Sequence, residues 1–379
     1  MKMNFFSKAE EKWNDFLQSK ISLYGLYRNY DYGPKGKNFV SGISQFISHR
    51  VLLEYSIIND VRKIHSSKSV SKFIEEVYWR IYWRGWLENK PSVWKHFINK
   101  KNENYDYALY EKAILGKTEL SFFNSWVDEL KEFNYLHNHT RMWFASTWIF
   151  NLGLPWELGA KFFLEHLYDG DSASNTLSWR WVAGLHTKGK KYLFTPKNLR
   201  KFSNNRFNVD LINNKQIDLF DEFDADFSDS VYSYKMKQKN KQLFLFENDL
   251  NFNSLKQLID RYENVFLILL DNQDRNIKIS DKVFNFKNLL LNEFESKFSN
   301  MQKIKSYNLH EKIENFTQVD VLYPGVGENL DFLESLESQR NVKFNYLVRE
   351  EDLYSWKYAR KGFFKFKENI PKINEFIKN

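Results

Sequence analysis

The sequence of 379 residues contains no cysteine. A chain without cysteine can form neither a disulfide nor a thiolate metal site, and this composition fits the reducing cytosol. We therefore expect a cytoplasmic protein. The first residues also lack the apolar core of a signal peptide, and the longest apolar runs, such as residues 265–270, are far too short to span a bilayer. We accordingly expect no membrane as a partner.

Aromatic residues are abundant in this chain. They make up 18% of it, with 12 Trp, 21 Tyr and 35 Phe. A bulky hydrophobic core accounts for most of the phenylalanines. Tryptophan and tyrosine rings can in addition stack on flat ligands or relay electrons. The length is sufficient for two domains, each with its own core.

Charge is unevenly divided between the two halves. Residues 1–210 contain 31 basic and 21 acidic residues, whereas residues 211–379 contain 25 basic and 27 acidic ones. The basic half also contains the aromatic motifs. A basic domain fits a polyanionic partner such as DNA. Charge alone does not decide this, because lysines accumulated without selection explain the excess equally well.

Residues 1–210 have the pattern of a helical domain. Residues 69–87 place apolar and aromatic side chains at helical spacing, and residues 119–133 and 141–167 favour further helices. Pro155 predicts the start of a new helix at Trp156. This part of the chain is therefore predicted to be predominantly α-helical.

The pattern changes after this helical part. Residues 211–240 are charged and weakly periodic, and we expect a linker there. In residues 241–379, β-rich runs alternate with helical stretches, which predicts a smaller α/β, Rossmann-like domain with a parallel sheet. The four runs are 242–246, 265–271, 319–324 and 344–350. A YPGVGEN segment follows the third run, but its glycine spacing is not that of a dinucleotide fingerprint, so it predicts a turn with weak ligand potential.

Several short motifs combine residues that can do chemistry. Arg141 together with the Asp169-Gly170-Asp171 segment could hold the polar edge of a bound ring, although DGD alone is also a common turn. The NFVSGIS segment could cradle a diphosphate with its backbone amides. Glu76 and Arg80 lie one helical turn apart with Trp79 beside them, which an intrahelical ion pair and a core tryptophan also explain.

His137 and His139 are the remaining pair of potential metal ligands. An i, i+2 pair does not share one face of a helix, and no compact set of carboxylates completes a site. We therefore expect no metal centre.

Taken together, the motifs of residues 136–207 resemble the flavin-binding core of the photolyase/cryptochrome family. This resemblance covers about residues 1–208 and implies a helical domain that binds FAD. It also implies which side chains contact the cofactor, with Val40 replacing the usual threonine of the phosphate loop. These cofactor-binding residues are Ser41, Ser44, Arg80, Arg141, Asp169, Asp171 and Asn175.

The same resemblance implies a substrate face and an electron relay. The expected substrate-facing residues are Glu76, Trp79, Asn138, Met142 and Trp181. Trp179 and Trp156 match the inner and middle members of the family's three-tryptophan relay. The outer tryptophan has no match, and Tyr105 or Tyr107 occupies the aligned region. Asn138 and Met142 stand where (6-4) photolyases have histidines, so the chain is more similar to the cyclobutane-dimer enzymes.

The resemblance implies a lyase, a deoxyribodipyrimidine photolyase that acts on DNA with ultraviolet-induced pyrimidine dimers. A cryptochrome-like blue-light receptor that binds FAD without repair is the alternative. Classical photolyases begin with an α/β domain, whereas here such a segment follows the helical domain, which implies either a permuted order or an analogous, antenna-type domain. A second antenna chromophore stays undetermined. We expect a monomer.

Overall fold

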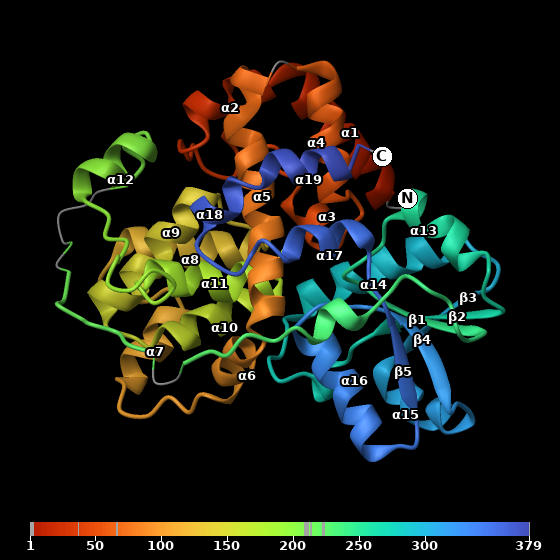
Figure 1. Cartoon of the computed structure of the whole chain (residues 1–379). Helices are drawn as coiled ribbons and strands as arrows, with labels where there is room; N and C mark the ends of the chain where they lie inside the picture. Colours follow the sequence, from red (N-terminus) through yellow and green to blue (C-terminus); the bar gives the residue numbers. More distant parts are fainter. Residues whose placement is uncertain are drawn as a thin grey trace.

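The computed structural model describes residues 4–36, 38–65, 67–207, 212, 214–221 and 224–378. Helices dominate as far as residue 202, and a parallel sheet follows residue 241 (Figure 1). The helical character predicted for the first half and the parallel sheet predicted for the second are thus confirmed. The predicted boundary at residues 210 and 211 lies outside the described residues.

The helical half packs its elements around one long helix. The helices are α1 (Phe5–Ser19), α2 (Ile21–Tyr27), α3 (Ser44–Ser48), α4 (Glu54–Ile64), α5 (Ser67–Asn89), α6 (Ser92–Asn99), α7 (Tyr107–Ile114), α8 (Ser121–Phe133), α9 (Asn138–Ser146), a π-helix (Thr147–Leu152), α10 (Trp156–His166), α11 (Ser172–Val182) and α12 (Pro196–Phe202). Pro155 precedes α10 with an extended backbone, and the helix begins at Trp156 as predicted.

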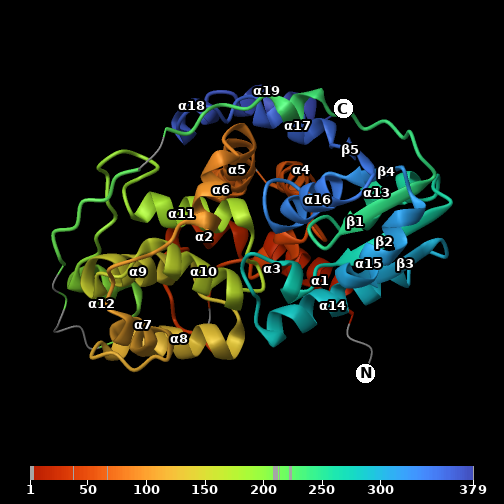
Figure 2. The same ribbon diagram turned by 90° about the horizontal axis from the view of Figure 1, so that it is seen from below.

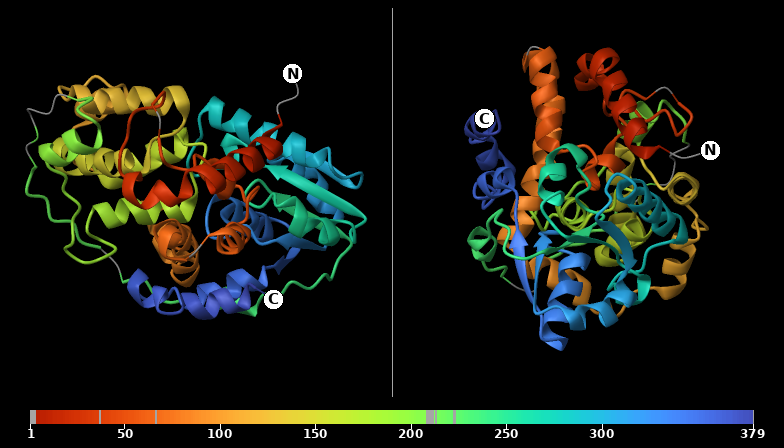
Figure 3. Two further views of the ribbon diagram at one scale, coloured as in Figure 1. Left: turned by 90° about the horizontal axis from the view of Figure 1, so that it is seen from above. Right: turned by 90° about the vertical axis from the view of Figure 1, so that its right-hand side faces the viewer.

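Helix α5 is the central element because it is apolar around most of its circumference. Val77, Tyr78, Ile81 and Tyr82 are all buried, as is typical of a helix surrounded by others. It packs against α2, α4 and α11, and on another side against the C-terminal helices. Figure 3 shows α5 in orange between the N-terminal helices in red and the C-terminal helices in blue.

The second half forms a five-stranded parallel sheet with the order β3-β2-β1-β4-β5. The strands are β1 (Gln242–Phe246), β2 (Asn264–Leu269), β3 (Met301–Lys305), β4 (Gln318–Leu322) and β5 (Lys343–Leu347), and the helices between them are α13 (Phe252–Ile259), α14 (Asp281–Glu295), α15 (Ser306–Lys312) and α16 (Glu328–Gln339). Four strands fall on the four predicted β-rich runs. Figure 2 shows helices on both faces of the sheet.

Strand β3 was not predicted, because its sequence MQKIK contains only two apolar residues. It lies at the edge of the sheet and pairs only with β2, from Val265↔Met301 to Leu269↔Lys305. An edge strand needs less apolar surface than a central one, so its short, mixed sequence carries no strong strand signal.

The sheet reverses its winding between β1 and β4, and the turn after β4 faces the helical half. In this turn Gly325 and Gly327 have φ of 78° and 153°, which favour glycine. The backbone N–H of Val326, between them, donates a hydrogen bond of 2.8 Å to Glu88 of α5. The turn predicted for YPGVGEN is confirmed, and its role is to join the sheet to the helical half.

Three C-terminal helices return from the sheet to α5. These are α17 (Glu350–Trp356), α18 (Phe363–Lys367) and α19 (Ile370–Phe376). Tyr78 donates a hydrogen bond of 2.7 Å to Asn374, and a Cβ atom on Gly85 would lie 2.6 Å from the Trp356 ring. The last part of the predicted α/β domain therefore packs on the helical half, and the domain limits stay predictions.

No helix in the described part of the chain is long and apolar enough to cross a membrane.

Candidate functional site

The Asp169-Gly170-Asp171 turn brings both carboxylates next to arginines from other helices. Arg141 of α9 donates to Asp169 at 2.8 Å, and Arg80 of α5 lies 2.7 Å from Asp171. Asp171 also caps α11, because its Oδ1 accepts a hydrogen bond of 2.8 Å from the backbone N–H of Ser174. The structure thus assembles four of the predicted cofactor residues in one cluster.

Arg80 is held by a carboxylate that the sequence did not reveal. Glu54, the first residue of α4, is fully buried. It contacts Arg80 at 3.1 Å, Arg50 at 3.2 Å and Arg84 at 3.6 Å. An acidic residue at the start of a helix is common and carries no functional signal by itself, so only the three-dimensional packing identifies Glu54.

Charge pairing keeps Asp171 ionised despite its burial. Burial alone would raise the pKa of Asp171, but the neighbouring Arg80 and Arg84 outweigh this effect and lower the pKa below its ordinary value. The same competition, with Arg50 and Arg84 as the leading cations, lowers the pKa of Glu54. The cluster therefore presents fixed negative and positive charges at neutral pH.

Several buried polar side-chain atoms of this region have no hydrogen-bond partner among the described residues. They include Asp169 Oδ1, Arg80 Nη2 and the indole N–H of Trp179. Buried polar atoms are nearly always paired, so these atoms fit a polar ligand between α5, α9 and α11. A flavin ring, with donors and acceptors along one edge, has the complementary chemistry.

The remaining predicted cofactor residues have varied surroundings. Asn175 is buried on α11 and donates a hydrogen bond of 2.9 Å to the carbonyl of Ala160. Ser41 and Ser44 are half-buried and flank Gly42, whose φ is 63°. Positive φ turns the backbone amides of such a loop outward, in a conformation able to bind an anion. Their role as a phosphate loop stays a prediction.

The predicted substrate-facing residues share partial exposure. Asn138 is exposed, whereas Glu76, Trp79, Met142 and Trp181 are half-buried. Helices α5, α9 and α11, which provide them, are in contact because α11 packs on both others. The helices lie together, but among the described residues no hydrogen bond, ion pair or ring contact joins any two of these five side chains, and their shared role stays a prediction.

Three of these residues already have partners within the chain. Glu76 forms an ion pair with Arg28, and the ring of Trp79 stacks on Phe363 of α18 with centroids 3.7 Å apart and planes 9° from parallel. Trp181 stacks on Tyr192 at 5.7 Å. The C-terminal helix α18 therefore covers one face of Trp79, which the sequence did not indicate.

The two histidines have structural contacts. His137 caps α9 by accepting a hydrogen bond of 3.2 Å from the backbone N–H of His139. The ring of His139 lies 2.9 Å from the carbonyl of Asn29 and 3.2 Å from the hydroxyl of Tyr192. Within the described residues, no group of three or more His, Cys, Asp or Glu side chains could hold a metal ion.

Residues 73–209 match the sequence model of the family described as the FAD binding domain of DNA photolyase. The chain contains a photolyase FAD-binding domain. This part of the chain is similar to the photolyase/cryptochrome family, and FAD is the cofactor of that domain. The matched residues include Arg80, Arg141, Asp169 and Asp171, the cluster with the unpaired buried atoms.

Curated relatives share this part of the sequence. The chain is 27% identical over 201 residues to a deoxyribodipyrimidine photo-lyase of Buchnera aphidicola, covering 49% of this chain and 40% of the relative. It is 30% identical over 183 residues to the deoxyribodipyrimidine photo-lyase of Agrobacterium fabrum, covering 46% of this chain and 37% of the relative. The matches thus span less than half the length of these photolyases.

Two solved structures resemble part of the chain at low similarity. A class III photolyase from Agrobacterium tumefaciens is 22% identical, with a TM-score of 0.43, and covers 52% of this chain and 42% of that chain. A cryptochrome from Synechocystis sp. PCC6803 is 22% identical, with a TM-score of 0.46, and covers 52% of this chain and 43% of that chain.

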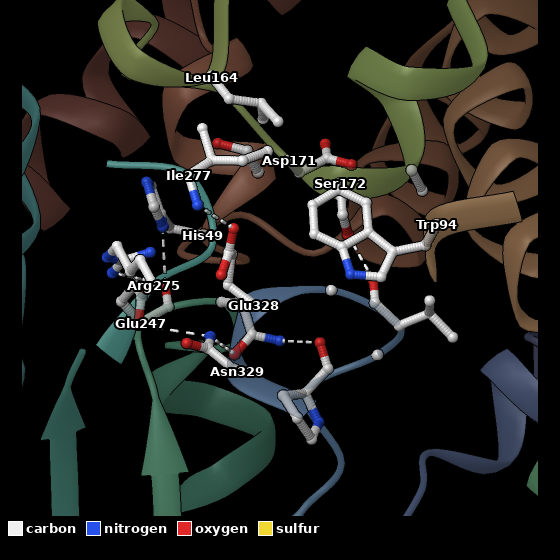
Figure 4. A pocket seen from close by; sticks show the side chains of 18 of the residues that line it. His49, Trp94, Leu164, Asp171, Ser172, Glu247, Arg275, Ile277, Glu328 and Asn329 are labelled. Carbon is white, nitrogen blue, oxygen red and sulfur yellow. Dashed lines mark hydrogen bonds and ion pairs between the residues drawn. The ribbon is translucent and has the colours of Figure 1, made fainter. Parts of the chain in front are cut away.

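A cavity of about 100 Å³ lies between the FAD-binding domain and the sheet. Figure 4 shows it between Asp171 and Ser172 above and Glu247, Arg275 and Asn329 below. Burial would raise the pKa of Glu247, but Lys287 and Arg275 lower it to about 2. The cavity is therefore lined by fixed charges, and it adjoins the segment that carries Asp171.

The contact between this domain and the sheet contains a carboxyl group with an unusual proton affinity. Burial raises the pKa of Glu88 to about 7, although Tyr323 and Val326 donate hydrogen bonds to it. The folded state therefore holds this proton more tightly than the unfolded state does. Its contribution to stability is complete below the ordinary pKa of 4.5 and is lost as the pH rises through about 7.

We expect the free energy of unfolding to fall between about pH 5 and pH 8, by on the order of 1.4 kcal/mol for each pKa unit of difference. The variant Glu88→Gln, which cannot ionise, should show a shallower dependence. Urea unfolding at several pH values measures both slopes. Equal slopes in the two proteins would show that Glu88 does not carry this proton linkage.

Proposed function

We propose that this chain is a light-driven DNA repair flavoprotein, a cyclobutane pyrimidine dimer photolyase. Its partner would be DNA with ultraviolet-induced pyrimidine dimers, and it would act as a cytoplasmic monomer. One observation carries the proposal: each of three adjoining helices provides side chains expected to contact FAD and side chains expected to face the substrate. Helix α5 has Arg80 beside Glu76 and Trp79, α9 has Arg141 beside Asn138 and Met142, and α11 has Asp171 and Trp179 beside Trp181.

This arrangement allows a base and the cofactor to meet between the same helices. Arg80, Arg141, Asp169 and Asp171 would hold the polar edge of FAD, with Asn175 beside it and Ser41 and Ser44 at the diphosphate. When bound and reduced, FAD supplies the light absorption and the electron that splits the dimer. The cluster's fixed charges are preorganised and need no rearrangement when charge moves on the ring.

The substrate-facing residues would bind a nucleotide flipped out of the duplex. Burial raises the pKa of Glu76, although Arg28 opposes the shift. The carboxyl of Glu76 and the amide of Asn138 can each form a hydrogen bond with polar groups of the dimer. Photolyases in general flip the target base out of the duplex. Trp79 and Trp181 offer aromatic faces on which such a base can stack, which offsets the stacking that it loses in the duplex.

The surface outside the pocket would grip the DNA backbone. Residues 1–210 have ten more basic than acidic residues, since they contain 31 and 21 of them. Phosphate contacts of this kind weaken as salt increases. Residues 241–379 would then form an antenna-type α/β domain joined through residues 211–240, and the strand order β3-β2-β1-β4-β5 supports its Rossmann-like character.

A cryptochrome-like blue-light receptor is the second candidate, and two contacts favour it. Phe363 lies flat on Trp79, and Arg28 occupies Glu76. Both side chains expected to bind the dimer are thus already engaged within the chain. A receptor would keep these contacts permanently, whereas a photolyase must release them when damaged DNA binds.

Repair under blue light distinguishes the two functions. Purified protein with chemically reduced FAD should restore an ultraviolet-damaged oligonucleotide in the light and leave it unchanged in the dark. A protein that binds FAD and responds to light, yet leaves the dimers intact, would be a receptor and not a photolyase.

A further inference from the structure

Aromatic rings connect Trp179 to the protein surface without passing through Trp156. Trp179 meets Trp148 edge to face, with centroids 6.4 Å apart, and Trp148 meets Tyr110 at 6.0 Å. Tyr110 in turn contacts Tyr107 at 6.2 Å, and Tyr107 is 61% exposed. The series is unbroken from a buried tryptophan to a tyrosine in contact with solvent.

The backbone around this series is unusual. Trp148 lies in the π-helix Thr147–Leu152, and π-helical turns occur frequently at functional sites. A Cβ atom on Gly159 of α10 would lie 2.3 Å from the Trp179 ring and 3.0 Å from the indole nitrogen of Trp148. Glycine at this position therefore lets both rings approach the same point of α10.

The surroundings of each ring suit the passage of an electron. The indole N–H of Trp148 donates to the carbonyl of Pro155 at 2.9 Å. A carbonyl is too weak a base to remove the proton, so an oxidised Trp148 stays a cation and oxidises tyrosine readily. Tyr107 has a base beside it: the charge of Glu111 and a hydrogen bond to it raise the pKa of Tyr107. Glu111 can accept the phenolic proton when Tyr107 loses an electron.

Trp156, which the family resemblance suggested as the middle member of the relay, has surroundings that are less suitable for electron transfer. The guanidinium of Arg180 lies 5.9 Å from its ring centre, and this positive charge disfavours a second one on Trp156 even though Asp221 pairs with Arg180. Its ring stacks on Phe97 at 5.4 Å, and a phenyl ring is harder to oxidise than an indole. Among the described residues, no ring contact joins Trp156 to Trp179.

We propose that Trp148, Tyr110 and Tyr107 are the electron relay of this chain, in place of Trp156 and an outer tryptophan. The proposal rests on the proposed function, because it takes Trp179 as the residue next to FAD. Trp179 gives one electron to photoexcited, oxidised FAD and becomes a radical cation. The electron hole moves to Trp148 and then to Tyr107, with the ring of Tyr110 bridging the two without being oxidised itself, and Tyr107 passes its phenolic proton to Glu111.

A thiol in solution completes the cycle. It donates a hydrogen atom to the Tyr107 radical and restores the tyrosine, while Glu111 returns its proton to water. Two of the resulting thiyl radicals combine as a disulfide. Each oxidised thiol thus leaves one electron on the FAD, and no atom is lost from the protein.

Laser flash photolysis of the FAD-loaded protein tests this route, with the absorption of tryptophan and tyrosine radicals as the readout. We expect a long-lived tyrosyl radical in the wild type. Trp148→Phe and Tyr107→Phe should each reduce its yield at least tenfold, and Trp156→Phe should change it less than twofold. Tyr107 is exposed, so its variant leaves the core intact, and FAD loading and circular dichroism check the folding of the two tryptophan variants.

Loss of the tyrosyl radical in Trp156→Phe together with its retention in Trp148→Phe would overturn the relay. A wild-type protein that forms only tryptophan radicals would also overturn it. Repair by the wild-type protein with chemically reduced FAD does not require the relay, so that assay decides the proposed function separately.

Discussion

Replacing Asp171 with alanine is expected to raise the dissociation constant for FAD about ten- to a hundredfold. A hydrogen bond to a charged group contributes about 1.5–3 kcal/mol, and each 1.4 kcal/mol is about tenfold in affinity. Asp171 is also the nearest counter-charge of Arg80, at 2.7 Å. Its loss leaves that guanidinium with Glu54 as its remaining carboxylate and turns it away from the cofactor edge.

The variant Asp171→Asn separates charge from capping. Asparagine caps helices as well as aspartate does, so it preserves the bond to the Ser174 backbone N–H that begins α11. Titration of flavin-free protein with FAD, followed by fluorescence, measures the affinities. If Asp171→Asn binds FAD as tightly as the wild type, the carboxylate charge is not part of the site, and the effect of alanine comes from the helix cap alone.

The double variant Glu76→Ala with Trp79→Ala is expected to keep FAD and lose the preference for damaged DNA. Stacking of a base on an aromatic side chain is worth about 1–3 kcal/mol, so the ratio of affinities for damaged and intact DNA should fall about tenfold or more. Binding of intact DNA should change little, because it depends on phosphate contacts with the basic surface.

Trp86→Ala provides a matched control for this variant. Trp86 is a half-buried tryptophan of the same helix, and its ring centroid lies 4.9 Å from that of His186. It is not one of the residues expected to face the substrate. Paired titrations of damaged and intact oligonucleotide at one salt concentration give the ratio for each protein. A double variant that retains the wild-type ratio would make Glu76 and Trp79 structural residues and would favour the receptor.

Local sequence patterns were sufficient for much of the fold. Strand β1 coincides with the predicted run, and α10 begins at Trp156 after Pro155. These elements have strong local signals, namely a continuous apolar run and a proline at a helix start. Strand β3 lacked such a signal, because its partner β2 and not its own sequence holds it in the sheet.

The candidate site was predictable only where a family motif exists. The resemblance named Arg80, Arg141, Asp169 and Asp171, and the structure joins them as two ion pairs. Glu54 could not be found in this way. Its role depends on Arg50, 4 residues before it, and on Arg80 and Arg84, 26 and 30 residues after it, and only the fold brings these arginines together.

The packing of Phe363 on Trp79 could not be predicted from the sequence for a similar reason. The two residues are far apart in the chain, and no periodicity links a C-terminal helix to the middle of α5. Contacts of this kind depend on how the chain returns from the sheet. The same applies to Trp148, whose contact with Trp179 depends on the π-helical turn and on Gly159.

The stoichiometry of FAD in the purified protein tests the central claim most directly. Absorption spectra of the protein before and after incubation with FAD, followed by removal of free cofactor, measure it. The cluster of Arg80, Arg141, Asp169 and Asp171 predicts about one FAD per chain, released on denaturation, and a tenfold or greater loss of affinity in Asp171→Ala. A folded protein that contains no flavin and takes up none would contradict the assignment of this cluster as the cofactor site.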